Sequence, residues 1–384
     1  MNDLRILPCA DTNLLQDFYT PNDFTKVNGD QIVEHNILSP LHLAALSSNN
    51  FKASPTVSYC EPSIVVFGVH HKLAPLSFRE KLSLSADNFY LHNGGIIKES
   101  VLINTCNRLE IYAVVSNIFE EKQLVTLFET MVQVPINPNF FFFKKNTEAI
   151  HHLFCVACGI ESQFFGEAEI LSQIKKAYST ATSKGKVGPI LHRVFQKSLQ
   201  ASKWARSSDN FIKNPTSLAS IAYSLINKFC IAPKIVVLGT GKCGQQIIRT
   251  LTREGFRDIY VANRTPSLDL IKRYSLTELS LDKALGSLSQ FDVLLLALGE
   301  SPHIIKKCLL PKRKNKQLII DFGVPRNIHP DCKKLNHIII YDLEEISNLT
   351  SIPPSYVSTQ TELWKANLIT KAKAVWTRFE QEDH

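Results

Sequence analysis

No apolar run in this sequence approaches the ~20 residues that a membrane-spanning helix requires. The chain has no recognisable secretory leader, and its nine cysteines are an odd number without the spacing of a disulfide framework. Internal repeats and low-complexity runs are missing as well. We therefore expect a chain without a membrane segment, in a reducing, cytoplasmic compartment.

A second pair of closely spaced cysteines is also missing. Cys155 and Cys158 form one C-x-x-C, whereas a structural zinc site needs four ligands. A redox pair would follow a strand in a thioredoxin-like unit, but this pair falls within a helical pattern. We therefore expect both cysteines to pack in the interior, and we expect no metal site.

The excess of charge of either sign is small. Lys and Arg number 43 against 35 Asp and Glu, a net charge of +8 over 384 residues. There is no arginine-rich tail and no RNA-recognition signature. The positive bias suits an anionic partner such as RNA or a nucleotide without identifying one. The length suggests two or three domains, each large enough for its own core.

What is present centres on the stretch V-L-I-N-T-C-N-R-L-E-I-Y-A-V-V. Two apolar runs, Val101–Ile103 and Ile111–Val115, predict strands with a polar loop over 104–110 between them. A lone cysteine such as Cys106 is usually a small buried apolar residue. Arg108 stands two positions later, however, and a nearby positive charge favours the thiolate, which is the nucleophilic form. The residues alone leave both interpretations open.

A second motif lies between a predicted strand and a predicted helix. Lys234–Leu238 reads as a strand, G-T-G-K-C-G follows directly, and Gln245–Arg253 reads as a helix before a strand at Asp258–Ala262. A G-x-G-x-x-G alone is weak evidence. Within such a β-α-β unit it indicates a dinucleotide site, because glycine backbone at a helix N-terminus accommodates a pyrophosphate. The expected binding residues are Gly239, Thr240, Gly241, Lys242, Cys243 and Gly244.

The residues after the second strand of this unit suggest which dinucleotide binds. NAD-binding units place an acid there for the ribose hydroxyls, whereas this chain has Asn263, Arg264 and Thr265. An arginine beside amide and hydroxyl groups suits the 2′-phosphate of NADP. The alternative, an exposed arginine at a helix start, explains its position less well. We therefore predict NADPH as the cofactor.

Periodicity divides the chain into four segments. Residues 1–62 have poor periodicity and are expected to be a poorly ordered N-terminal extension. Residues 63–213 are expected to form an α+β domain with helices over one side of a sheet. Residues 214–348 are expected to form a Rossmann-like α/β domain with a parallel sheet, and 349–384 a long helix. The expected apolar stripe of that helix is Leu363, Ala366, Ile369, Ala372, Trp376 and Phe379.

Helices within 63–213 are predicted at 118–132, 147–158, 167–184 and 190–206, with Thr147 as the N-cap of the second. The last of them has a polar side that is either a solvated face or a surface for a phosphate backbone. That side consists of His192, Arg193, Lys197, Lys203 and Arg206.

One half of the chain thus offers a candidate nucleophile and the other a candidate hydride donor. A thioester formed on Cys106 could accept a hydride and collapse to an aldehyde. The combination indicates a reductase of an activated carboxyl group, or the reverse, an aldehyde dehydrogenase.

Five segments together resemble the glutamyl-tRNA reductase family, over roughly Ile64 to Glu380. They are G-V-H-H-K-L-A-P-L-S-F-R-E, T-C-N-R-L-E-I-Y, G-I-E-S-Q-F-F-G-E-A-E-I-L-S-Q-I-K, V-L-G-T-G-K-C-G with A-N-R-T, and D-F-G-V-P-R-N-I. The resemblance implies NADPH-dependent reduction of glutamyl-tRNA to glutamate-1-semialdehyde through a cysteine thioester. In the family this is the first step of tetrapyrrole (porphyrin and haem) synthesis from glutamate, and its chemistry requires no metal.

The resemblance also implies roles for individual residues. Cys106 takes the position of the nucleophile. His152, ten residues before Ser162, takes that of an activity-critical histidine that holds or releases a proton; without the resemblance it reads as a histidine on a helix face. Arg108 would clamp the glutamyl carboxylate. The implied substrate contacts are Thr105, Asn107, Arg108, Ser162, Glu167, Ala168, Glu169 and Gln173.

Three features depart from the family pattern. The family's E-P-Q reads Glu167-Ala168-Glu169 here, and Cys155 stands where relatives usually have arginine, which bears on substrate affinity rather than on the chemistry. The sequence contains the start of the family's linking (spinal) helix but ends at His384, before a helical dimerisation domain, so the family's homodimer is not carried over. The implied partners are glutamyl-tRNA and, as a further candidate, glutamate-1-semialdehyde aminomutase.

Two other functions remain to be weighed. A non-catalytic protein that binds NADPH and tRNA would be expected to lack Cys106 or His152, and both are present. A different NADP-dependent dehydrogenase that shares only the second domain would not carry the segment T-C-N-R.

Overall fold

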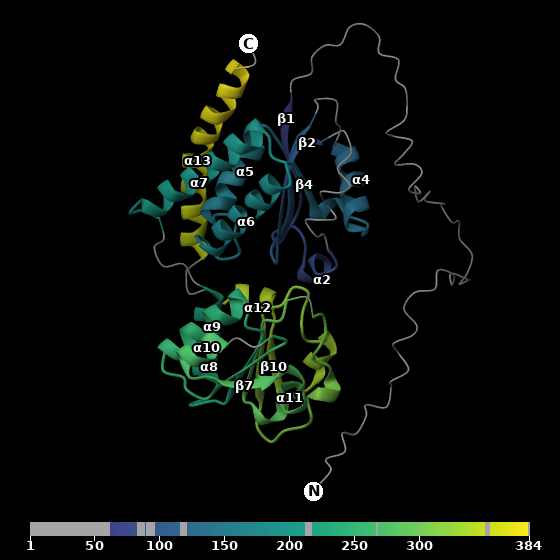
Figure 1. The fold of residues 1–384 in the computed structure, drawn as a ribbon, viewed down its shortest axis with the longest axis vertical. Coiled ribbons are helices and arrows are strands. Elements are labelled where there is room, and N and C mark those ends of the chain that lie inside the picture. The colour runs from purple at the N-terminus through teal and green to yellow at the C-terminus, as the bar shows by residue number, and fades with distance from the viewer. Residues whose placement is uncertain are drawn as a thin grey trace, which may run out of the picture. The chain divides into compact units, whose positions relative to one another are not determined.

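The structure is a computed structural model (Figure 1). It describes residues 62–82, 89, 97–115, 121–211, 217–265, 268–299, 301–349 and 354–382. The extension predicted over 1–62 lies outside these residues except for Pro62. Within the described residues, no helix is both long enough and apolar enough to cross a membrane.

A four-stranded antiparallel sheet, in the order β2-β3-β1-β4, opens the described chain. Its strands are β1 (Ser63–His70), β2 (Ile97–Thr105), β3 (Arg108–Val115) and β4 (Phe141–Lys145). The helices that accompany it are α2 (Leu76–Arg79), α4 (Glu121–Val132), α5 (Thr147–Cys158), α6 (Glu169–Ser183) and α7 (Pro189–Ser207).

Helices cover both faces of this sheet, not the single side that the sequence predicted (Figure 1). Phe67 of β1 packs edge-on against Phe128 of α4, with ring centroids 6.3 Å apart. Tyr112 of β3 points to the opposite face, where its ring lies 5.7 Å from that of Phe195 in α7. Because both faces are covered, every residue of β3 is buried.

Two helix starts differ from the predictions. Asn146, not Thr147, is the N-cap of α5, and its φ of 49° is in the left-handed region. Its side-chain oxygen accepts a hydrogen bond from the Ile64 N–H at 3.1 Å, so the side chain joins the helix start to β1 rather than capping the helix. Helix α6 begins at Glu169, which leaves Glu167 in the preceding loop.

A six-stranded parallel sheet follows, in the order β10-β9-β8-β5-β6-β7. Its strands are β5 (Ile235–Leu238), β6 (Ile259–Asn263), β7 (Thr277–Ser280), β8 (Val293–Leu296), β9 (Gln317–Asp321) and β10 (Ile338–Tyr341). Its helices are α8 (Leu218–Phe229), α9 (Lys242–Arg253), α10 (Leu268–Tyr274), α11 (Leu281–Gly286) and α12 (Leu343–Ser347). This confirms the Rossmann-like fold; β7 was not predicted, because this edge strand is mostly exposed and carries one apolar residue.

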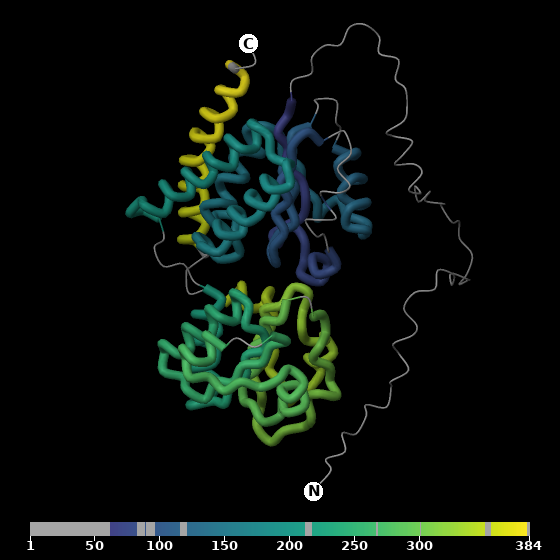
Figure 2. Tube along the Cα trace, viewed as in Figure 1, coloured from purple at the N-terminus to yellow at the C-terminus, as the bar shows by residue number. Residues whose placement is uncertain are grey.

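Helix α13 (Pro354–Glu382) packs along α5 and α7 (Figure 2). Its buried residues are Trp364, Leu368, Ala372 and Val375. The predicted stripe was right in its C-terminal half, where Ala372 is buried and Trp376 and Phe379 pack against the core. It was wrong in its N-terminal half, where Leu363 is 46% exposed and Trp364 is buried in its place. The Trp364 ring fixes which face of α13 turns inward, because its centroid lies 5.4 Å from that of the Trp204 ring and 5.1 Å from that of the Phe211 ring. Apolar residues on neighbouring faces of the helix left the sequence pattern ambiguous.

Candidate active site

Cys106 lies at the tip of the hairpin between β2 and β3. Thr105 pairs with Arg108 across the hairpin, so the turn consists of Cys106 and Asn107 and the predicted polar loop over 104–110 was too long. The Thr105 hydroxyl stabilises this tight turn, because Oγ1 accepts hydrogen bonds from the N–H groups of Asn107 and Arg108, each at 3.2 Å.

Arg79, at the end of α2, holds this turn in place. Its Nη1 donates a hydrogen bond to the Cys106 carbonyl, and its Nε donates one to the Ala74 carbonyl at 3.2 Å. The His71 N–H also donates to the Asn107 carbonyl at 2.9 Å. Arg79 was not predicted as a site residue, although it stands in the F-R-E segment; a charged side chain that is buried (7% exposed) is the signal that only the structure provides.

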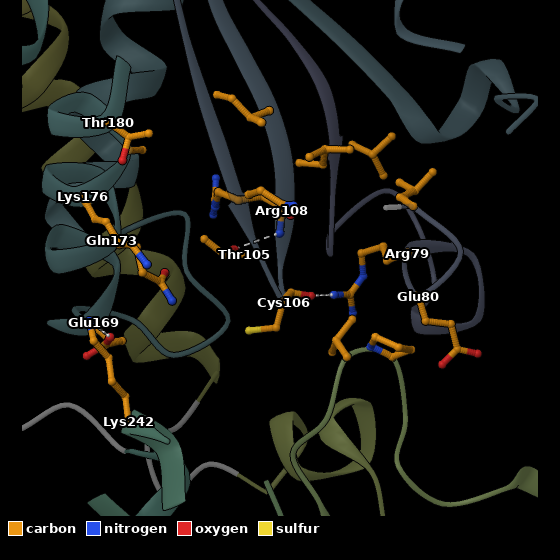
Figure 3. Close-up of a pocket in the computed structure, with 18 of the residues that line it drawn as sticks. Arg79, Glu80, Thr105, Cys106, Arg108, Glu169, Gln173, Lys176, Thr180 and Lys242 are labelled. Atoms are coloured by element: carbon orange, nitrogen blue, oxygen red, sulfur yellow. Dashed lines mark hydrogen bonds and ion pairs between the residues drawn. The ribbon is translucent and has the colours of Figure 1, made fainter. Parts of the chain in front are cut away.

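The electrostatics at Cys106 differ from the sequence prediction. Burial and the nearby Glu167 carboxyl raise the pKa of the Cys106 thiol to about 11, and the Arg79 and Arg108 guanidiniums offset only part of that rise. In Figure 3 the Arg79 guanidinium meets the Cys106 carbonyl, while the thiol points away from it. The thiol, not the thiolate, is therefore the resting form near neutral pH.

A buried cluster lies beside the hairpin, around Glu110 of β3. Arg108 Nη1 donates to Glu110 Oε1 at 2.7 Å, and the Tyr112 hydroxyl donates to Oε2 at 3.0 Å. Nε2 of His152, on α5, lies 3.2 Å from the same Oε1. Sequence reasoning did not single out Glu110, yet the alternation of Arg108, Glu110 and Tyr112 along one strand could have placed all three side chains on one face.

The loop between α5 and α6 is anchored from α7. Arg206 donates from Nη1 to the Gly166 carbonyl at 2.8 Å and from Nη2 to the Glu167 carbonyl at 2.7 Å. The predicted basic face of α7 is therefore not a uniform surface, since Arg206 is an internal anchor. Burial and then the neighbouring Glu169 raise the pKa of the Glu167 carboxyl to about 7, against the lowering effect of Arg108 and Arg206.

A cavity of about 710 Å³ lies next to the Cys106 turn. Glu169, Gln173, Lys176 and Thr180 line it from one face of α6, opposite the hairpin (Figure 3). Of the predicted site residues, the cavity brings together Thr105, Cys106, Arg108, Glu169, Gln173 and Lys242. The remaining predicted catalytic and substrate residues are not among its lining; they are Asn107, His152, Ser162, Glu167 and Ala168.

The glycine-rich loop after β5 has the geometry of a dinucleotide loop. Gly239 has φ +100°, and a Cβ there would lie 2.3 Å from the Ala297 carbonyl oxygen. A Cβ on Gly244 would lie 2.0 Å from the Gly239 carbonyl oxygen, whereas one on Gly241 would meet nothing within 4 Å. Gly239 and Gly244 thus serve the fold, and Gly241 leaves open space at the start of α9, where a pyrophosphate can approach.

The end of β6 carries polar groups and no carboxylate. The Asn263 amide donates to the Thr240 hydroxyl at 2.7 Å, and Arg264 Nη2 donates to the Ser301 hydroxyl at 2.6 Å. Asn327 holds the Ser301 segment, because its amide donates to the Ser301 carbonyl at 3.1 Å. An arginine with amide and hydroxyl neighbours, and no carboxylate, thus stands at the end of the second strand of the β-α-β unit.

The remaining predictions concern the Cys155–Cys158 pair and metal ligands. Cys155 and Cys158 are buried in α5, as predicted, and burial raises the pKa of the Cys158 thiol to about 12. In the part of the chain that the structure describes, no three His, Cys, Asp or Glu side chains come together as metal ligands.

Comparison with known proteins covers both sheets. Residues 67–209 match the family model for the N-terminal domain of glutamyl-tRNAGlu reductase, and 222–349 match that for shikimate/quinate 5-dehydrogenase. Glutamyl-tRNA reductase of Aquifex aeolicus is 30% identical over 305 residues, which cover 74% of each chain. That of Macrococcus caseolyticus is 31% identical over 304 residues, 74% of this chain and 68% of the relative. A solved glutamyl-tRNA reductase from Methanopyrus kandleri is 24% identical, with a TM-score of 0.43 and coverage of 83% of this chain and 80% of that one.

Proposed function

Since this chain belongs to the glutamyl-tRNA reductase family, we propose that it reduces the glutamyl group of glutamyl-tRNA to glutamate-1-semialdehyde with NADPH, through a thioester on Cys106. This reaction would be the first step of tetrapyrrole synthesis from glutamate. The observation that carries the proposal is the position of Cys106 at a two-residue turn that faces a cavity lined by Gln173 and Lys242.

The first step needs a sulfur nucleophile and an activated acyl group. The Cys106 thiol loses its proton, its sulfur attacks the ester carbonyl, and the bond to the ribose oxygen breaks as the tRNA leaves and takes up a proton. An ester is a far better electrophile than a free carboxylate, which explains why an acyl-tRNA would be the substrate. Because the pKa of the thiol is about 11, a base must accept the proton or the substrate must lower the pKa.

Arg108 is the proposed partner of the substrate carboxylate. Its two terminal nitrogens are engaged with Glu110 and with the Glu161 carbonyl. Its Nε is buried and has no hydrogen-bond partner among the described residues. We propose that the glutamyl carboxylate reaches this donor from the cavity that Arg108 lines. We propose that the remaining substrate contacts come from Thr105, Gln173 and the Glu167–Glu169 segment, and that His152 holds or releases the proton of the reaction.

NADPH supplies the hydride that converts the thioester to the aldehyde. The residues that would hold it are the loop from Gly239 to Gly244, with open space at Gly241, and Asn263, Arg264 and Thr265 beside the ribose. Arg264 is the proposed contact of the 2′-phosphate, because a guanidinium binds a phosphate with paired hydrogen bonds.

The test follows NADPH oxidation and semialdehyde formation with glutamyl-tRNA, for the wild type, Cys106→Ser and Cys308→Ser. Cys308 is an exposed thiol away from the cavity lining and serves as the matched control. We expect turnover by the wild type and Cys308→Ser and none by Cys106→Ser. Equal turnover by all three would mean that Cys106 is not the nucleophile. NADPH binding without any turnover would favour a non-catalytic binding protein.

A further inference from the structure

The inference concerns Glu110, the centre of the buried cluster and a residue that no step above uses. Glu110 is fully buried, and burial alone would raise its pKa. The Arg108 guanidinium and the His152 ring instead hold the pKa of Glu110 well below its ordinary value. Glu110 is therefore a carboxylate over the whole working pH range, and a carboxylate only accepts hydrogen bonds.

The other oxygen of Glu110 has a permanent donor. Burial and then the Glu110 charge raise the pKa of Tyr112 well above its ordinary value, so the Tyr112 hydroxyl stays protonated and donates to Oε2. Oε1 is left to be shared by Arg108 and His152. One carboxylate thus orients a guanidinium and an imidazole at the same time.

The acceptor-only character of Glu110 decides the tautomer of His152. Nε2 must carry a hydrogen to bond to Oε1, so in the neutral ring Nδ1 carries the lone pair. The ring plane is also held, because the Tyr112 ring stacks on it at 6.4 Å and 22° and the Phe142 ring lies 5.0 Å away. The His70 ring of β1 stacks at 6.3 Å, and burial lowers its pKa to about 4, so it adds no charge near neutral pH.

We propose that Glu110 is a positioning residue that fixes His152 with its hydrogen on Nε2, so that Nδ1 is the nitrogen that exchanges the proton of the reaction, while it aligns Arg108. This rests on the proposed function of the site, since it concerns the proton and the carboxylate of that reaction. Where a carboxylate sets the tautomer of a catalytic histidine, removal of that carboxylate lowers the reaction rate by roughly 10- to 100-fold or more.

The first experiment compares Glu110→Gln, Tyr112→Phe and His152→Asn in the turnover assay with glutamyl-tRNA and NADPH. The amide introduced by Glu110→Gln would no longer define which nitrogen carries the hydrogen, so we expect kcat to fall about 10- to 100-fold. KM is expected to rise as well, because Arg108 loses its charged partner. Tyr112→Phe keeps both hydrogen bonds to Oε1 and the ring that stacks on His152, so kcat should fall less than in Glu110→Gln. The double variant Glu110→Gln/His152→Asn should have the same kcat as His152→Asn, because Glu110 acts on kcat through His152.

The second experiment reads the tautomer directly and needs no activity. The wild-type protein is labelled with 15N-histidine, and its 12 histidines are compared with those of His152→Asn to assign the His152 signals. We expect the Nε2–H tautomer at neutral pH in the wild type and in Tyr112→Phe, and a mixture of tautomers in Glu110→Gln.

Three results would overturn the inference: a wild-type His152 with its hydrogen on Nδ1, an unchanged kcat in Glu110→Gln, or a further fall of kcat in the double variant. If Glu110→Gln does not fold, the wild-type and Tyr112→Phe spectra still decide the tautomer. A wild type without turnover would instead count against the proposed function, and the spectra would still test the role of Glu110.

Discussion

The Arg264 guanidinium donates a hydrogen bond to the Ser301 hydroxyl at 2.6 Å. This contact joins the end of β6 to the segment after β8, at the edge of the sheet where ligands bind in folds of this kind. Ser301 therefore orients the guanidinium of Arg264, which follows the second strand of the β-α-β unit. A single hydrogen bond to the hydroxyl leaves other guanidinium N–H groups to donate to a phosphate.

Arg264→Ala should weaken NADPH binding without affecting NADH. A hydrogen-bonded charge pair contributes about 1.5–3 kcal/mol, which corresponds to roughly a 10- to 150-fold rise in the Kd of NADPH. The Kd of both cofactors can be measured by fluorescence titration. Arg253→Ala, which changes an exposed arginine at the end of α9, is the control and should leave both values unchanged. A parallel loss of NADH affinity would assign Arg264 to the fold of the loop rather than to the 2′-phosphate.

Two glycines of the dinucleotide loop should respond differently to alanine. Gly241→Ala should fold with unchanged thermal stability, because its Cβ meets nothing within 4 Å, yet it should lose at least about tenfold in NADPH affinity, since the methyl group takes the place of the pyrophosphate. Gly244→Ala should lower Tm, because its Cβ would lie 2.0 Å from the Gly239 carbonyl oxygen.

Differential scanning calorimetry and NADPH titration separate these two effects. Gly286→Ala, at the end of α11 and also without a neighbour within 4 Å, is the control for both measurements. Unchanged NADPH affinity in Gly241→Ala would place the pyrophosphate elsewhere.

Glu167→Gln should make Cys106 react at lower pH. Burial is the main reason for the raised pKa of the Cys106 thiol, and the negative charge of Glu167 is the next. Removing that charge stabilises the thiolate relative to the thiol, so the pKa of Cys106 falls. The rate of Cys106 alkylation by iodoacetamide, followed by peptide mass spectrometry from about pH 7 to about pH 11, should reach its midpoint at lower pH in the variant.

The same samples provide the control for this measurement, because the exposed Cys308 should alkylate with an unchanged pH profile. A profile of Cys106 that stays in place, or moves to higher pH, would show that Glu167 does not act on the thiol through its charge.

Arg206→Met should destabilise the protein although it keeps most of the volume and the apolar stem of the side chain. The change leaves the Gly166 and Glu167 carbonyls without their donors, and each unsatisfied buried group costs about 1–3 kcal/mol. We expect a loss of roughly 2–5 kcal/mol in the free energy of unfolding, measured by urea denaturation. Lys203→Met, on the exposed side of the same helix, should change it by less than about 0.5 kcal/mol.

Local sequence determines the Cys106 turn, the dinucleotide loop and the buried strands, because each depends on residues that are close together in the chain. The turn around Cys106 follows from strand patterns and the adjacent Thr105 hydroxyl. The dinucleotide loop follows from glycines whose backbone conformation and close contacts tolerate no Cβ at Gly239 and Gly244. The buried strands and the two types of sheet follow from apolar periodicity.

What only the tertiary structure decided are the properties that arise when distant segments meet. The high pKa of Cys106 depends on burial and on Glu167, which is distant in the sequence, and the sequence showed only the neighbouring arginine. The Glu110 carboxylate meets His152, which is 42 positions away in the sequence. In α13, Trp364 rather than Leu363 is buried, because its ring packs against Trp204 and Phe211. Solvation and side-chain contact depend on which surfaces are brought together, and periodicity along one chain cannot specify that.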